Sequence, residues 1–173
     1  MRTFLREITI TLALAVAIFF VLQISVQSFV IVGSSMRPTF HDSQRILINK
    51  IVYNFHEPER GDVIVFHPPD NEQADYIKRI IALPGDTIEI KDGRVYVNGN
   101  KLDEPYIIAL PSYTTKFREI SEDKYFVLGD NRNNSNDSHT GWLVPRQNII
   151  GKAWLSIWPP SEWGIAANYA LPG

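Results

Sequence analysis

The sequence contains no cysteine among its 173 residues. This absence excludes a thiol nucleophile, disulfide bonds and thiolate metal ligands, so the fold must be stabilised by its own core. A basic excess is missing as well, because the formal net charge is −2 and the isoelectric point is near 6.1. Such a balance provides no broad basic field to gather nucleic acid. With 45% hydrophobic and 21% charged residues, the composition fits one packed domain plus an anchor rather than a disordered chain.

Charge is also absent from the segment between Ile8 and Leu22, in which two threonines are the only polar residues. The stretch continues to Ser28 and so reaches about the 20 residues needed to cross a bilayer. Arg2 and Arg6 precede it, which favours an N-terminus kept in the cytoplasm. A cleaved secretory signal has a similar shape, but this apolar stretch is longer than the usual signal core.

We therefore expect a retained membrane anchor rather than a removed signal. The expected division is a cytoplasmic N-terminus at residues 1–7, a transmembrane anchor at residues 8–28 and an extracytoplasmic domain at residues 29–173.

Beyond Gln23 the apolar block gives way to alternating apolar and polar residues, which indicates a helix followed by a strand. Short β-branched or aromatic segments bounded by turn residues then dominate, and long amphipathic helices are missing. These patterns predict strands over residues 46–51, 63–66, 77–83, 87–90, 95–97, 125–128 and 149–157.

Turn residues organise these strands further. Asp92-Gly93 and Asn98-Gly99 tolerate positive φ and predict tight hairpins. The segment from about residue 85 to 123 is more polar and less regular than its flanks, which suggests a smaller inserted lobe. The sequence therefore predicts a mainly β protein, with an antiparallel β-sheet domain, a smaller inserted β lobe and one N-terminal transmembrane helix.

Ser35 lies directly after the anchor and is followed by Met36-Arg37-Pro38-Thr39. A serine at this place is a potential nucleophile for chains that emerge from the bilayer. The alternative is a turn around Pro38 that is capped by hydroxyl groups. Because serine is a weak nucleophile, the catalytic interpretation needs a base elsewhere in the chain.

Histidine is the usual base, but none of the four histidines lies in a recognisable triad sequence. Lysine can replace it when burial lowers its pKa from about 10.4 toward roughly 7 to 8. Lys78 lies in an apolar strand segment next to Arg79, and alternation does not decide which of the two points inward. A guanidinium cannot release its proton, so chemistry favours Lys78. Lys50 is a rival base, and a solvated Lys78 is the alternative without catalysis.

A third segment, Gly129 to Ser138, is dense in asparagine, aspartate and serine. Side chains of these types hydrogen bond to their own backbone, so an Asx-rich loop is one interpretation. Oxygen ligands for calcium are another, although the spacing does not match the glutamate-terminated calcium loop.

Together these segments resemble bacterial type I signal peptidases, the membrane-bound serine proteases that remove signal peptides from exported proteins. The similarity spans most of the chain, from the anchor to about Trp158. Any one block is weak, but the ordered set is specific. The blocks appear in the order of that family: Ser35-Met36-x-Pro38-Thr39, Arg45 to Lys50, Arg60 to Phe66, Lys78-Arg79 with Leu83 to Asp86, and Gly129 to Ser138.

The resemblance implies a role for each matched residue. Ser35 would be the nucleophile and Lys78 the general base, and Ser135 would orient the lysine by a hydrogen bond. Met36 would help to shape the cleft. The geometry of the site would be held by two carboxylates, those of Asp130 and Asp137.

The resemblance also implies an oxyanion hole that includes the backbone N–H of Ser35. Some members add a serine hydroxyl two positions earlier, where this chain has Gly33, so Ser34 is the candidate for the second donor. Many members end the last block with arginine where this chain has His139, which would make an ion pair with Asp137 dependent on pH.

The implied activity is that of a serine endopeptidase that cuts N-terminal signal peptides through an acyl-enzyme, without a cofactor or metal. Its partners would be precursor proteins with small residues one and three positions before the cut, and the lipid bilayer, but no nucleic acid. The location would be a bacterial plasma membrane or a thylakoid-type membrane. The alternatives are an inactive membrane-anchored β binding module of the same fold and a related Ser/Lys protease that cuts itself or a regulator.

Overall fold

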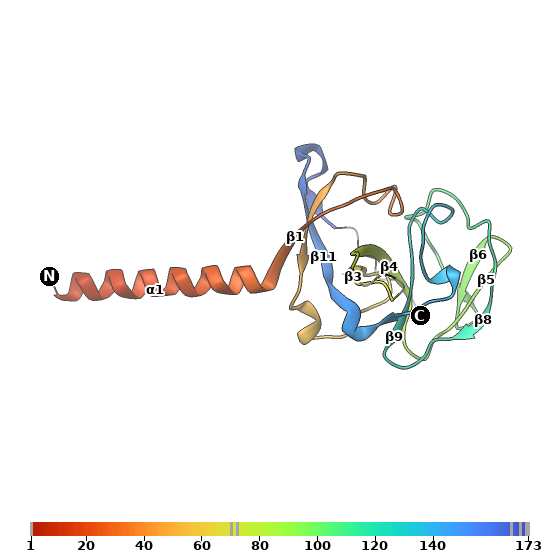
Figure 1. The fold of residues 1–173 in the computed structure, drawn as a ribbon, viewed down its shortest axis with the longest axis horizontal. Coiled ribbons are helices and arrows are strands. Elements are labelled where there is room, and N and C mark those ends of the chain that lie inside the picture. The colour runs from red at the N-terminus through yellow and green to blue at the C-terminus, as the bar shows by residue number, and fades with distance from the viewer. Residues whose placement is uncertain (1, 70, 72, 167, 170, 172–173) are drawn as a thin grey trace.

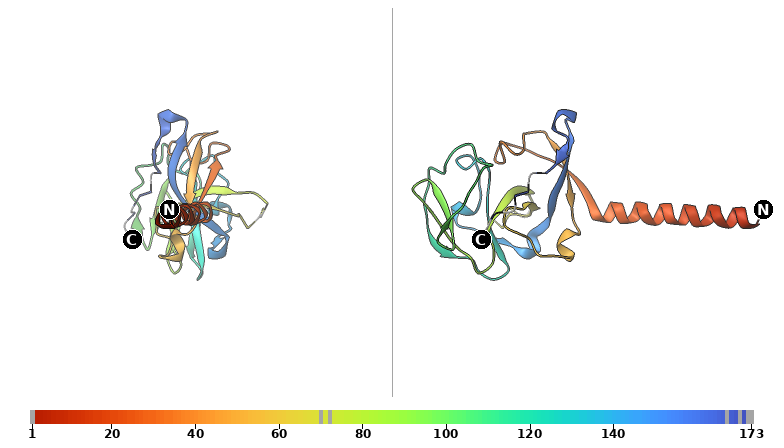
Figure 2. Two further views of the ribbon diagram at one scale, coloured as in Figure 1. Left: turned by 90° about the vertical axis from the view of Figure 1, so that its left-hand side faces the viewer. Right: turned by 180° about the vertical axis from the view of Figure 1, so that it is seen from behind.

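The computed structural model describes residues 2–69, 71, 73–166, 168–169 and 171. The N-terminal helix α1 (Arg2–Ser25) projects from a β-rich domain as a single rod (Figure 1). Its segment Thr3–Ser25 is long and apolar enough to cross a membrane and is not buried against the rest of the protein. The view from behind in Figure 2 (right) shows the same separation of the helix from the domain, and the left view looks along the helix.

Polar groups within α1 are satisfied inside the helix itself. The hydroxyls of Thr9, Thr11 and Ser25 each donate to the backbone carbonyl four residues earlier, over 2.6–2.9 Å. Such internal bonds suit a helix in lipid, where no water can satisfy a hydroxyl. The helix ends at Ser25, three residues before the expected end of the anchor, because Val26 already begins strand β1 (Val26–Val30).

The larger sheet is antiparallel throughout and contains eight strands in the order β1-β2-β11-β3-β4-β9-β10, with β12 paired to β11. The bounds of its remaining strands are β2 (Arg45–Asn49), β3 (Val63–Phe66), β4 (Tyr76–Ala82), β9 (Lys124–Leu128), β10 (Val144–Pro145), β11 (Ile149–Trp158) and β12 (Gly164–Ile165). Four single-turn 3₁₀ helices join these strands: η1 (Val52–Asn54), η2 (Ser138–Thr140), η3 (Arg146–Asn148) and η4 (Pro160–Glu162).

The smaller sheet has four strands in the order β7-β6-β5-β8 and is inserted between β4 and β9. Its strands are β5 (Thr87–Lys91), β6 (Arg94–Val97), β7 (Asn100–Lys101) and β8 (Thr115–Glu119). Both predicted hairpins are present, with positive φ at Asp92-Gly93 and at Asn98-Gly99. In Figure 1 this sheet lies at the end of the domain that is remote from α1.

The predicted mainly β fold is therefore confirmed, and so are all seven predicted strands. The predicted hairpin at Asn98-Gly99 accounts for β7, but the sequence did not reveal β8 or the two-residue strands β10 and β12. These strands carry too few residues, or too polar a pattern, to stand out from loops.

Strand β3 is buried on both faces, and this determines the surroundings of its neighbour β4. Val63 and Val65 pack into one hydrophobic cluster, whereas Ile64 and Phe66 pack into another. In the antiparallel register Val63 lies opposite Arg79 and Ile64 opposite Lys78. From Lys78 to Ala82 the side chains on both faces of β4 are consequently buried, whichever way they point.

Candidate active site

Ser35 and Lys78 are 43 positions apart in sequence and meet in the fold. Ser35 lies in the loop after β1, and Lys78 lies on β4. The Lys78 Nζ atom is 2.8 Å from the Ser35 Oγ atom, which is hydrogen-bonding distance. Only 4% of the Lys78 surface is exposed. The nitrogen also lies 2.9 Å from the carbonyl oxygen of Ile77 and 5.2 Å from the centre of the Tyr76 ring.

Burial lowers the pKa of Lys78 from 10.5 to about 8. Loss of hydration is the largest cause, since it disfavours the charged amine. The carboxylates of Asp137 and Asp130 act in the opposite direction, but they do not cancel the effect of burial. An amine with a pKa near 8 is neutral in an appreciable fraction of molecules at neutral pH, as a general base must be.

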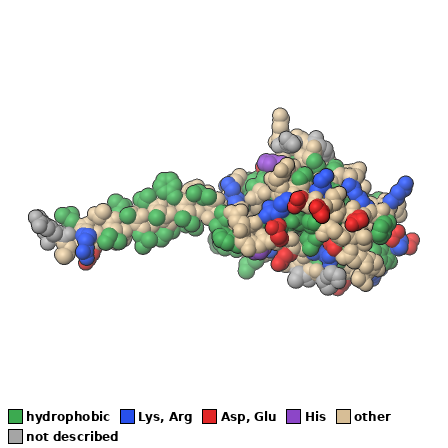
Figure 3. All heavy atoms as spheres, turned by 90° about the horizontal axis from the view of Figure 1, so that it is seen from below, with side chains coloured by type: hydrophobic (Ala, Val, Ile, Leu, Met, Phe, Trp, Pro, Cys, Tyr) green, Lys and Arg blue, Asp and Glu red, His purple; other side chains and the backbone are tan. Residues whose placement is uncertain are grey.

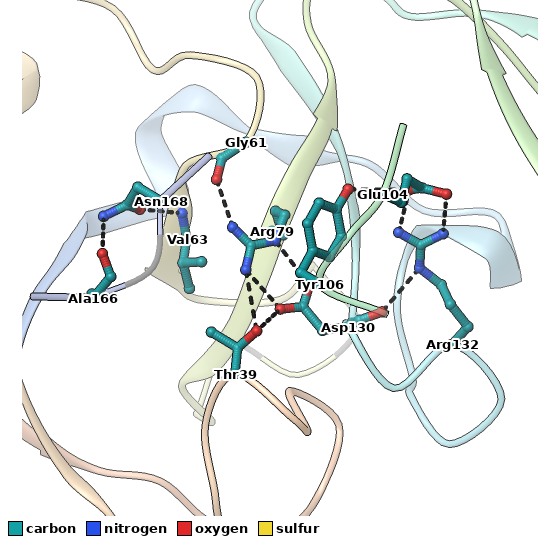
Figure 4. Close-up of polar contacts among 11 residues, drawn as sticks. Thr39, Gly61, Val63, Arg79, Glu104, Tyr106, Asp130, Arg132, Ala166 and Asn168 are labelled. Carbon is teal, nitrogen blue, oxygen red and sulfur yellow. Dashed lines mark hydrogen bonds and ion pairs between the residues drawn. The ribbon is translucent and has the colours of Figure 1, made fainter. Parts of the chain in front are cut away.

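Arg79, the neighbour of Lys78, is fully buried on the other side of the strand. Its guanidinium makes two hydrogen bonds to Asp130, from Nε to Oδ1 over 2.9 Å and from Nη2 to Oδ2 over 2.6 Å. Nη1 donates to the Gly61 carbonyl over 2.8 Å, and Thr39 also donates to Asp130 (Figure 4). Alternation could not choose between Lys78 and Arg79 because both side chains are enclosed.

The segment Gly129–Ser138 holds the loop that carries Ser35. The Asn131 backbone N–H donates to the Ser35 carbonyl over 2.9 Å, and the Asn131 side chain donates to the Ser34 carbonyl over 3.1 Å. Asn134 Nδ2 donates to Ser34 Oγ over 2.9 Å. In the sequence both asparagines are only members of an Asx-rich loop. Their fixed place in the last block of the resemblance was the available sign of a positioning role.

Gly129 is required where this segment passes the two serines. A Cβ atom added to it would lie 2.3 Å from Ser135 Oγ and 2.5 Å from the Ser35 carbonyl oxygen, closer than side chains approach. Ser135 therefore packs beside the nucleophile loop. Its hydroxyl is buried and has no hydrogen-bond partner among the described residues, so the bond to Lys78 that the resemblance implies is not formed in this structure.

Asp137 is fully buried and fixes the far end of the segment. Its carboxylate accepts from the Gly129 N–H over 2.9 Å and from the His139 backbone N–H over 3.2 Å. The Nδ1 atom of His139 lies 2.7 Å from Asp137 Oδ1, and the ring stacks on Tyr113 at 4.1 Å between centroids. His139 thus occupies the partner position expected for arginine.

A groove of about 490 Å³ runs past Ser35 and Lys78. Its other lining residues are mainly apolar: Phe29, Val30, Ile31, Val32, Ile46, Val65, Asp75, Tyr76, Ile77 and Asn136. Met36 is not among them, because it is buried in the core cluster with Ile46 and Val65 and so supports the groove from behind. Asn136 was not expected to line the groove.

Lys50, the rival base, is exposed and does not line the groove. Two of the four histidines pair with carboxylates elsewhere, His67 with Asp75 and His139 with Asp137. Within the described residues no cluster of three or more histidine, aspartate or glutamate side chains could hold a metal ion.

Residues 2–158 match the model of the family described as signal peptidase, peptidase S26. The chain belongs to this signal peptidase family. A probable signal peptidase I-2 from Synechocystis sp. is 44% identical over 160 residues, which cover 87% of this chain and 73% of the relative. Signal peptidase IB from a strain of Staphylococcus aureus is 38% identical, with 97% of each chain covered.

Among solved structures, a signal peptidase I from Enterococcus faecalis is 34% identical and matches with a TM-score of 0.49, covering 56% of this chain and 96% of the other. Membership of the signal peptidase family identifies the activity as that of a serine endopeptidase that removes signal peptides. Its substrates are precursor proteins. The apolar helix α1 is consistent with the single-pass membrane anchor of such an enzyme.

Proposed function

We propose that Ser35 is the nucleophile and Lys78 the general base of signal peptide cleavage. The observation that carries this proposal is the 2.8 Å contact between Ser35 Oγ and an enclosed amine whose pKa is lowered to about 8. Positioning of this kind, together with an activating base, turns a weak alcohol into an effective nucleophile.

In the acylation step, neutral Lys78 accepts the hydroxyl proton while Ser35 Oγ attacks the scissile carbonyl carbon. The resulting ammonium gives that proton to the departing amine of the mature protein, and the signal peptide is left as an ester on Ser35. Neutral Lys78 then takes a proton from water, which attacks the ester. Collapse of the tetrahedral intermediate formed by this attack returns the proton from Lys78 to Ser35 and releases the signal peptide.

Negative charge on the carbonyl oxygen requires donors during both steps. The backbone N–H of Ser35 is the first donor, and the Ser34 hydroxyl is the candidate for the second. Ser34 Oγ already accepts a hydrogen bond from Asn134, so its own proton remains available for donation. The Asn134 bond therefore gives the candidate a defined orientation.

The substrate would bind as an added strand between β1 and β4. Strand β4 pairs with β3 from Tyr76 to Arg79, but its pairing with β9 begins only at Arg79. The other edge of the residues from Tyr76 to Lys78 is therefore open to a peptide backbone, as in strand addition. The apolar groove lining fits uncharged side chains, and the family resemblance implies that those one and three positions before the cut are small.

An exposed apolar surface would bring the domain to the lipid. The side chains of Trp154, Trp158 and Trp163 are 45%, 56% and 68% exposed, so core packing does not explain them. They lie on β11 and beside η4, near Ile165 of β12, which is also exposed. Tryptophan favours the membrane interface, because its ring is apolar and its N–H is polar.

The proposed topology follows from this surface and from α1. Apolar side chains cover α1, and charged side chains appear near its N-terminal end (Figure 3). We place residues 1–7 in the cytoplasm, the anchor within residues 8–28 and residues 29–173 outside, at a bacterial plasma membrane or a thylakoid-type membrane. The smaller lobe would occupy about residues 85–123.

The test is cleavage of a precursor with alanine at the first and third positions before the cut. Full-length enzyme in phospholipid vesicles is compared with Ser35→Ala, Lys78→Met and the control Lys50→Met. We expect cleavage by wild type and the control, and a loss of at least about a thousandfold in the other two. A wild type as inert as both variants would favour the binding module, and activity of Ser35→Ala would exclude Ser35 as nucleophile.

A further inference from the structure

The chain beyond the family match, which ends at residue 158, returns across the larger sheet toward the active site. Strand β12 first pairs with β11, with Ile165 opposite Leu155. The Ala166 N–H then donates to the Trp154 carbonyl over 2.8 Å, and Ala166 is buried. The residues that follow are thereby brought beside β3 rather than released into solvent.

Asn168 fastens this segment to the start of β3. Its Oδ1 atom accepts a hydrogen bond from the Val63 N–H over 2.8 Å. Its Nδ2 atom donates to the carbonyls of Ala153 and Ala166 over 3.1 and 3.2 Å. Figure 4 shows Asn168 between Val63 and Ala166. One amide side chain therefore ties the C-terminal segment to both β3 and β11.

Tyr169 continues from this point to Gly61. Its N–H donates to the Gly61 carbonyl over 3.3 Å, and the same carbonyl accepts from Arg79 Nη1 over 2.8 Å. Gly61 has φ of +95°, and a Cβ atom built on it would lie 1.6 Å from the Tyr169 carbonyl oxygen. Only glycine allows this approach, so residue 61 is adapted to the C-terminal segment.

The Tyr169 ring also contacts Arg79 directly. Its centre is 5.0 Å from the Arg79 Cζ atom, and the centre of the Tyr106 ring is 4.2 Å from the same atom. The two rings contact each other, with centroids 5.3 Å apart. A guanidinium is attracted to aromatic faces, so the two rings hold the Arg79 guanidinium in place while the Asp130 carboxylate compensates its positive charge.

We propose that Asn168 and Tyr169 are positioning residues of the active site, acting through Arg79 and Asp130 on the loop that carries Ser35. Asp130 directly precedes Asn131, whose N–H holds the Ser35 carbonyl. Displacement of the guanidinium would therefore shift the backbone that orients the nucleophile. This inference rests on the proposed function, because Ser35 must be the nucleophile for its orientation to matter.

The experiment measures kcat, KM and the pH profile of kcat/KM for full-length enzyme in detergent, with a synthetic peptide substrate. Tyr169→Leu is compared with Tyr169→Phe, which keeps the ring. The matched control is Tyr96→Leu, which removes a tyrosine from β6 whose ring lies 5.2 Å from Lys91 Nζ in the smaller sheet.

We expect Tyr169→Leu to lower kcat by roughly ten- to a hundredfold, as small displacements of reacting groups do, with KM changed less than about twofold. A looser Arg79 leaves Asp130 less compensated, so the rising limb of the profile moves to higher pH. Tyr169→Phe and Tyr96→Leu should keep kcat within about twofold of wild type. Asn168→Ala should act in the same direction as Tyr169→Leu.

Three results would overturn the inference. The first is that Tyr169→Leu leaves both kcat and the rising limb of the pH profile of kcat/KM unchanged. The second is that Tyr96→Leu loses as much kcat as Tyr169→Leu. The third is a lower kcat with an unmoved limb, which identifies a loss of folded enzyme alone. Each of these leaves cleavage dependent on Ser35 and Lys78 in the same assay. Failure of the proposed function is different, because Ser35→Ala would then remain active.

Discussion

Replacement of Lys78 by methionine should stabilise the protein at neutral pH while abolishing cleavage. Folding lowers the pKa of this amine from 10.5 to about 8, so below pH 8 the protonated side chain opposes folding. At about 1.4 kcal/mol per pH unit, the cost is about 3 kcal/mol. The two hydrogen bonds of the amine offset about 1 kcal/mol each at most. The expected net gain of Lys78→Met at pH 7 is therefore about 1–3 kcal/mol.

The sign of the pH dependence follows from proton binding. Between pH 8 and 10.5 the unfolded chain binds more protons at residue 78 than the folded protein does, so wild-type stability rises with pH in this window. Lys78→Met lacks this group, and its advantage over wild type should shrink toward pH 10.5. A matched variant, Lys50→Met, removes an exposed lysine and should show neither effect.

The measurement is urea unfolding of the full chain in detergent, followed by tryptophan fluorescence at pH 7 and pH 10. The free energy of unfolding of each variant is compared with wild type at both values. If Lys78→Met is no more stable than wild type at pH 7, or if its advantage persists at pH 10, the lysine is not held against a desolvation cost. The explanation of its basicity would then be wrong.

Three further outcomes are expected. The kcat/KM of wild type should rise with pH through a value of about 8 and be about a tenth of its plateau at pH 7, which a pH profile with a soluble peptide will check. Gly129→Ala should lose at least about a hundredfold in kcat, because its Cβ would displace Ser135 and the Ser35 carbonyl; steady-state kinetics on folded enzyme will measure this. Ser135→Ala should raise the free energy of unfolding, measured with urea, by about 1 kcal/mol, because a buried unpaired hydroxyl is removed. If Ser135 turns to Lys78 once substrate is bound, the same variant should lose kcat, and unchanged kcat would argue against that role.

The larger elements were accessible from the sequence because they follow a simple period. The run of β-branched residues in β3 and the turn dipeptides of the β5–β6 hairpin specify their conformations locally. The end of α1 was less accessible. Residues 26–28 (Val-Gln-Ser) fit either the end of a helix or the start of a strand, and pairing of Val26 with Asn49 of β2 decides for the strand.

Contacts between distant segments could not be read from the sequence in the same way. The contact between Tyr169 and Arg79 joins residues 90 positions apart, and no local sequence pattern predicts it. The resemblance implied a hydrogen bond from Ser135 to Lys78, but the Ser135 hydroxyl packs beside Gly129 and has no hydrogen-bond partner among the described residues. Sequence patterns therefore indicated which residues gather, and the tertiary contacts determine which atoms touch.

Lys78 and Arg79 are neighbouring buried cationic side chains of one strand, and they differ in chemistry. Arg79 meets the carboxylate of Asp130 through two hydrogen bonds, so its charge is compensated where it lies. Lys78 contacts the Ser35 hydroxyl and the Ile77 carbonyl. The carboxylates of Asp137 and Asp130 raise the pKa of Lys78, but by less than burial lowers it. Burial without a contacting carboxylate favours the neutral amine. Asp130 therefore compensates the arginine, and because it is engaged there without touching the amine, it opposes proton loss from Lys78 more weakly than burial promotes it.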